Sequence, residues 1–104
     1  MYIQRLTAES IVVSGTGTTA ETTITVPATT TFAAGAVYDI LVSAQVPAGT
    51  DGTIIVISNG TIDTALYQQG TGNYARSRCL GCRKVIRVRF LDDPAHFNLL
   101  AVRG

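Results

Sequence analysis

The sequence predicts an all-β protein, a single-domain antiparallel β-sandwich of jelly-roll type with about eight strands. First, short stretches rich in β-branched residues recur about every ten residues, with turn-forming residues between them. Second, no long stretch shows the helical spacing of apolar residues. Third, a chain of 104 residues has room for one domain, so residues 1–104 are expected to fold as a single unit.

The centre of the expected fold is residues 37–67, which are predicted to form three strands joined by two turns. Alternating apolar residues predict a strand over 37–46, and residues 53–58 are apolar on both faces, which predicts a central strand. Asn59-Gly60 then predicts a two-residue type I′ hairpin, a turn that needs positive φ at both central positions. The chain is expected to return as a strand over 61–67.

Shorter strands are expected on the N-terminal side, where residues 16–31 are rich in threonine. Alternation places Ile24 and Val26 inward and the threonines outward. In the connection that follows, Phe32 is a candidate anchor into the core. The expected N-terminal strands are residues 2–6, 11–14 and 22–26.

On the C-terminal side, residues 84–91 (KVIRVRFL) alternate apolar and basic side chains, which predicts a half-buried strand with one wet or partner-facing side. Asp93-Pro94 resembles the start of a helix, with aspartate at the cap and proline at the first position. A helix over 94–103 is therefore the alternative to a final strand. The other expected C-terminal strands are residues 74–78 and 97–102.

Charged residues make up only 14% of the chain, below the roughly 25% of typical globular domains. Such a surface is expected to be partly covered, most simply by other copies of the chain. Residues 1–75 carry one basic and five acidic residues, whereas residues 76–104 carry seven basic and two acidic ones. This asymmetry suggests head-to-tail complementarity between copies or a basic face toward an anionic partner, with neutralisation inside one compact domain as the alternative.

The chain has no apolar run approaching the ~18 residues of a membrane span, and residues 1–6 lack the pattern of a secretory signal. We therefore expect a protein that folds in a cytoplasm and does not enter a membrane.

A cluster of basic residues predicts a protein interface, with Arg76, Arg78, Arg87 and Arg89 as its contact residues. Arginine is enriched at protein interfaces and lysine is depleted, and the chain has seven arginines and one lysine. Nucleic-acid sites usually add stacking aromatics, of which only Tyr74 is nearby, so a protein partner is favoured over nucleic acid. The alternative is a solvated face whose arginines pair with aspartates. The full cluster is Arg76, Arg78, Arg83, Lys84, Arg87 and Arg89.

No residue pattern predicts catalysis, a metal or a cofactor. Cys79 and Cys82 supply two thiolates, whereas a structural zinc site needs four ligands, so free thiols are expected, with a disulfide or a metal shared between subunits as alternatives. His96 beside Asp93 could act as a general base, but no recognisable motif places a nucleophile with it. Exposed tyrosines and the loop over 68–74 leave a carbohydrate- or host-surface-binding module as the alternative function.

From Gly72 to Gly104 the chain resembles small β-rich proteins encoded by tailed bacteriophages and prophages of gut bacteria. The resembling features are Gly72-Asn73-Tyr74, Arg76-Ser77-Arg78, the basic strand ending at Phe90, and Asp93-Pro94-Ala95-His96-Phe97. The resemblance implies a non-enzymatic virion component, a capsid decoration or head-associated protein, made in the cytoplasm of a bacterial host. Its expected partners are copies of itself, the phage capsid and other virion proteins.

Overall fold

The computed structural model describes residues 2–42, 53–70, 72–76 and 84–103. Eight strands form the fold, as expected, and within the described residues the only helical element is the 3-10 turn η1 (Gly17–Thr19). The last strand covers Ala95–Arg103, so the helix alternative over 94–103 is wrong. The strands are β1 (Ile3–Thr7), β2 (Ser10–Ser14), β3 (Glu21–Thr25), β4 (Val37–Val42), β5 (Ile54–Ser58), β6 (Asp63–Gln68), β7 (Lys84–Asp92) and β8 (Ala95–Arg103).

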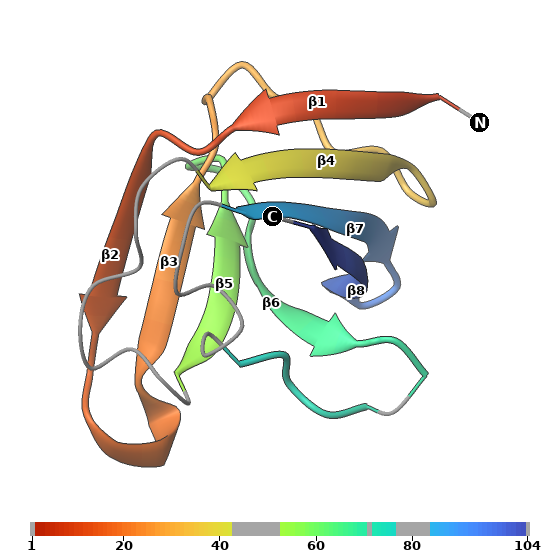
Figure 1. The fold of residues 1–104 in the computed structure, drawn as a ribbon. Coiled ribbons are helices and arrows are strands. Elements are labelled where there is room, and N and C mark those ends of the chain that lie inside the picture. Colours follow the sequence, from red (N-terminus) through yellow and green to blue (C-terminus); the bar gives the residue numbers. More distant parts are fainter. Residues whose placement is uncertain (1, 43–52, 71, 77–83, 104) are drawn as a thin grey trace.

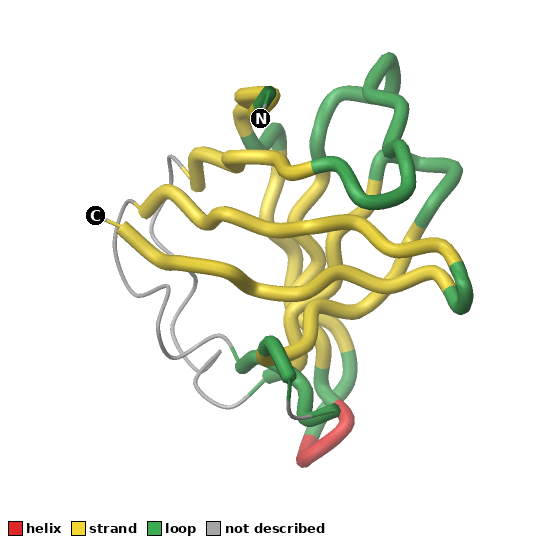
Figure 2. The backbone as a smooth tube through the Cα atoms, turned by 90° about the vertical axis from the view of Figure 1, so that its right-hand side faces the viewer, coloured by secondary structure: helices red, strands yellow, loops and turns green. Residues whose placement is uncertain are grey.

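All eight strands belong to one sheet, in the order β1-β4-β7-β8-β6-β5-β3-β2, which curls into a half-barrel (Figures 1 and 2). The pairs β1–β4, β3–β5 and β6–β8 are parallel and the other pairs are antiparallel. The expectation of a purely antiparallel fold is therefore wrong, and the two separate sheets of a sandwich are not confirmed. The strands form one sheet rather than two because β6 pairs with β5 through its first half and with β8 through its second half. It thereby joins the half of the sheet that contains β5 to the half that contains β8.

The two edge strands, β1 and β2, are consecutive in the chain and meet at one corner (Figure 1). Only Ala8 and Glu9 separate them. The amide of Ala8 donates to the carbonyl of Leu41, 2.9 Å away, and the amide of Glu9 donates to the carbonyl of Thr25, 2.7 Å away. This short link is thus bonded to both halves of the sheet, and it draws the two edges together.

The hydrophobic core fills the inside of the curl. β5 is buried along its whole length, which confirms that it is a central strand. Phe32 is only 7% exposed, and its ring contacts those of Tyr38, Phe90 and Phe97 at centroid distances of 5.1, 5.7 and 4.9 Å. The prediction that Phe32 anchors its loop to the core is confirmed. The largest fully buried side chains are Phe97, Ile24, Ile40, Ile55, Ile57, Leu66, Ile86, Val26, Val37, Val42 and Val88.

The turn between β5 and β6 corrects one expectation. The hairpin is present, but Gly60 has φ of 90° and Asn59 does not have positive φ, so the turn is not type I′. Asn59 is buried instead, and its Oδ1 accepts hydrogen bonds from the amides of Thr61 (3.0 Å) and Ile62 (2.7 Å). Its Nδ2 donates to the carbonyl of Thr30 at 2.7 Å, which ties the turn to the loop that carries Phe32.

The alternation in β3 holds for Ile24 and Val26, but the expectation that the threonines point outward is wrong at Thr22. Thr22 is fully buried, and its hydroxyl lies 2.6 Å from that of Thr53, the residue just before β5. Two hydroxyls that bond each other satisfy their polar groups inside the core, so the position tolerates a threonine.

Residues 72–76 bridge β5 and β6 at the point where the direct pairing of these two strands ends. Ala75 donates its amide to the carbonyl of Leu66 (2.8 Å) and accepts from the amide of Ile55 (3.2 Å). The strand expected over 74–78 is reduced here to isolated bridges at Tyr74 and Arg76. Residues 77 and 78, and residues 43–46 of the strand expected after Val37, lie outside the described residues.

Candidate functional site

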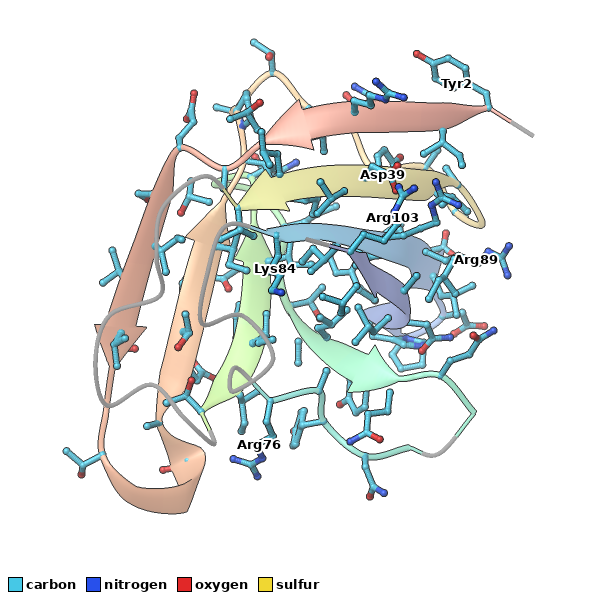
Figure 3. The ribbon with its side chains drawn as sticks, in the orientation of Figure 1. Tyr2, Asp39, Arg76, Lys84, Arg89 and Arg103 are labelled. Carbon is cyan, nitrogen blue, oxygen red and sulfur yellow. The ribbon has the colours of Figure 1, made fainter. Side chains whose placement is uncertain are left out.

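The outer face of β1, β4 and β7 carries a row of charged residues across three strands. Strand register places Arg5 beside Asp39, and Asp39 beside Arg87. Alternation explains the row, because Tyr38 and Ile40 on either side of Asp39 point into the core. Figure 3 shows Asp39 with Arg103, from β8, directed toward it.

Asp39 is the centre of this arrangement and is 6% exposed. Arg87 donates two hydrogen bonds to it, from Nε to Oδ1 at 2.8 Å and from Nη2 to Oδ2 at 3.1 Å. Arg103 donates a third, from Nη2 to Oδ2 at 2.9 Å. The hydrogen bonds from Arg87, helped by the nearby charges of Arg103 and Arg5, hold the pKa of Asp39 below its ordinary value, although burial opposes them. The same pairing raises the pKa of Arg87.

A groove of about 620 Å³ opens beside Asp39, along the β1 edge of this face. Leu41 and Val85 give it an apolar floor, and its rim is basic. Arg5 and Lys84 take part in no ion pair within the described residues. The described residues that line the groove are Arg5, Leu6, Thr7, Asp39, Leu41, Lys84, Val85 and Arg103.

The structure describes three of the four arginines predicted to form an interface. Arg87 and Arg89 lie on the same face of β7, as their spacing predicted, but Arg87 is paired with Asp39 inside the chain. Arg76 lies well away from Arg89 and Arg103 (Figure 3). Arg78 is outside the described residues, as are Cys79 and Cys82. An interface role for these arginines stays a prediction.

Sequence reasoning missed three members of the site: Arg5, Asp39 and Arg103. Each was visible as a charged residue in or next to an apolar strand. Their proximity depends on β1 pairing with β4, and β4 with β7, which are contacts across about 34 and 48 residues of sequence. Charge alternation alone does not specify such pairings.

A second, smaller hollow of about 280 Å³ lies where the turn between β7 and β8 approaches the end of β6. The rings of Tyr67 and Tyr74 are stacked with centroids 4.9 Å apart, and His96 meets Tyr67 edge-on at 5.6 Å. The Tyr74 hydroxyl raises the pKa of Tyr67. His96 Nδ1 lies 2.6 Å from the carbonyl oxygen of Pro94. The hollow is lined by Tyr67, Gln68, Gly70, Gly72, Pro94, Ala95, His96 and Asn98.

In the part of the chain that the structure describes, no three His, Cys, Asp or Glu side chains gather as a metal site would require. Within the same part, no helix is long and apolar enough to cross a membrane. No protein-family model matches the chain, and no curated protein and no solved structure matches it.

Proposed function

We propose that this protein is a non-enzymatic structural component of a bacteriophage virion, a capsid decoration or head-associated protein made in the cytoplasm of the bacterial host. It acts through self-association and through contacts with capsid or other virion proteins. The resemblance of residues 72–104 to small phage proteins supports the virion part of this proposal. We further propose that the half-barrel is a variant of the jelly-roll sandwich, because its two halves pack side chains toward each other across one core.

The observation that carries the contact function is Asp39 fixing two arginines on an open sheet face. Asp39 holds the guanidinium groups of Arg87 and Arg103, so these long side chains have already lost much of their conformational freedom. A surface ordered in advance loses less entropy on binding than one with free side chains. Arg89 extends the same face along β7, and the groove with its apolar floor lies toward the other end of that strand, beside Lys84 and Val85. Arginines around apolar residues are typical of protein interfaces.

The test is the size of the purified protein by light scattering, and its binding to capsids that lack it. We expect concentration-dependent self-association or capsid binding that weakens in the double variant Arg89→Gln/Lys84→Gln. A matched control, Thr61→Glu together with Thr64→Glu, lowers the net charge equally from β6 and the turn before it. Protein that stays monomeric at tens of micromolar and leaves capsids bare would overturn the proposal.

A second candidate function, binding of carbohydrate on a host surface, is favoured by the hollow at Tyr67. Stacked aromatic rings with amide side chains nearby offer a flat apolar face and hydrogen-bonding groups together, and sugars have complementary surfaces. Gln68 and Asn98 supply the amides here, and Tyr74 is 40% exposed. A glycan array tests this function: hits that disappear in Tyr74→Ala support it, and an array without hits removes it.

A further inference from the structure

Among the strands that the structure describes, two leave one side of their backbone without a strand partner. Within this described part, β1 pairs only with β4, and β2 pairs only with β3, because they occupy the two ends of the strand order. Free N–H and C=O groups along such an edge can pair with a strand from another chain. Proteins usually block this pairing with charged residues, prolines or bulges on the edge strand.

β2 lacks those protective features. Its sequence, SIVVS, contains no charged residue and no proline, and its register with β3 is regular. Val12 is 57% exposed and Val13 37% exposed, so apolar side chains face solvent on both sides of the strand. β2 therefore has the character of a strand that is covered by a partner.

The two edges differ in charge. Glu9 directly precedes β2, and Glu21 pairs with Ser14 at its other end; both glutamates are exposed, and they are the only charged residues over 8–36. β1 carries Arg5, and the groove beside it adds Lys84 and Arg103. The β2 edge is thus apolar with acidic ends, and the β1 edge is basic beside an apolar groove floor. Opposite charges of this kind steer two surfaces together and fix their register.

From these observations we infer that copies of this chain join head to tail, the β2 edge of one copy adding to the β1 edge of the next. This inference rests on the proposed function and specifies how its self-association occurs. Because the contact uses two different surfaces, each copy has one of each to offer, and the series closes into a ring or continues as a filament. β1 and β2 run in different directions (Figure 1), so each added copy turns relative to the last, as a closed ring requires.

The first arm of the test measures amide hydrogen exchange at low and high protein concentration. Head-to-tail addition predicts concentration-dependent protection on both β1 and β2, because each strand gains a hydrogen-bonded partner. Protection confined to β2 would indicate a symmetric β2–β2 pair and overturn the inference. Self-association without protection on either edge would also overturn it, while leaving the proposed function standing. A protein that never associates and never binds capsids would defeat both.

The second arm uses substitutions at exposed positions. Val12→Lys places a charge in the middle of β2 and should weaken self-association about tenfold or more, whereas Thr61→Lys, on the turn between β5 and β6, should leave it unchanged. Val12→Thr keeps a β-branched side chain without the charge and should stay close to wild type. Equal association of Val12→Lys and wild type, with unchanged circular dichroism, would overturn the inference.

The third arm tests the direction of the contact by mixing. Arg5→Glu/Lys84→Glu makes the β1 edge acidic, and Glu9→Lys/Glu21→Lys makes the β2 edge basic. Each double variant alone opposes like charges and should associate about tenfold more weakly, while an equimolar mixture should recover assembly with the two variants alternating. Adding Val12→Lys to the second variant should stop the mixture at pairs, because only the contact between its basic β1 edge and the acidic β2 edge of the first variant remains; assemblies larger than pairs would show charge attraction without strand addition and overturn the inference.

Discussion

Arg87 holds Asp39 through two hydrogen bonds, Nε to Oδ1 at 2.8 Å and Nη2 to Oδ2 at 3.1 Å, and this fork joins β4 to β7 on the outer face of the sheet. Asp39 is buried although it faces outward, and the guanidinium groups of Arg87 and Arg103 lie against its carboxylate. One carboxylate therefore links β4 to β7 and to β8, and it also positions two arginines on this face.

Replacing Asp39 by asparagine should destabilise the fold. Asp39→Asn keeps the shape of the side chain but removes the charge that Arg87 and Arg103 share. Because both arginines are partly exposed, we expect a loss of about 1–2 kcal/mol in the free energy of unfolding. Urea denaturation measures it, with Asp63→Asn as the exposed control. Equal stability of Asp39→Asn and wild type would show that the pair contributes nothing net.

The contribution of Asp39 should depend on pH. Its pKa in the folded state lies below the ordinary value of 3.8, so the unfolded chain binds a proton at higher pH than the folded one. The stabilisation is complete above the ordinary value and is lost as pH falls through the folded pKa. Thermal unfolding from about pH 6 down to about pH 2 should show the difference between wild type and Asp39→Asn shrinking only at the acidic end. A difference that grows on acidification would contradict this.

Asn59 should be critical for the turn between β5 and β6. Its side chain accepts from two amides and donates to the carbonyl of Thr30. Asn59→Ala would leave these buried groups without partners and should cost about 1–3 kcal/mol of unfolding free energy. Asn59→Asp retains the two accepted bonds and should lose less, and Thr61→Ala, exposed in the same turn, serves as the control. Chemical denaturation of the three variants ranks them.

Phe32 should account for a large part of the stability of its loop. Its ring contacts three buried aromatic rings, so Phe32→Ala would create a cavity at the point where the loop meets the core. We expect a loss of about 3 kcal/mol or more, whereas Phe32→Leu should retain most of the packing. The comparison is made by thermal or urea denaturation. A loss below about 1 kcal/mol for the alanine variant would show that the loop anchors elsewhere.

Most strand positions could be predicted from the sequence, because period-two alternation depends only on neighbouring residues. β7 is the clearest case, with Ile86, Val88 and Phe90 buried as predicted. Which strand pairs with which could not be predicted. The pairing of β1 with β4 and of β6 with β8 brings together residues far apart in the chain. The alternation within a strand does not indicate which other strand it pairs with. The mixed sheet was missed for this reason.

The same limit applies to the candidate site. Arg87 and Arg89 were identified because one face of β7 is basic, and that is a local property. The ion pair between Arg87 and Asp39 needed the register of two strands 48 residues apart in sequence. At the turn after β5, Asn59 and Gly60 correctly predicted a reversal, but the contact with Thr30 decided its geometry, and that contact comes from a distant loop.

The connection through Ala8 and Glu9 has a mechanical consequence. A curled sheet normally fails by peeling, one outermost strand lifting off at a time. Here the two outermost strands, β1 and β2, are connected by Ala8 and Glu9. The amides of these two residues are hydrogen-bonded to the carbonyls of Leu41 and Thr25. A force that pulls on one edge strand is therefore also transmitted to the other. The sheet thus resists unfolding from a single edge.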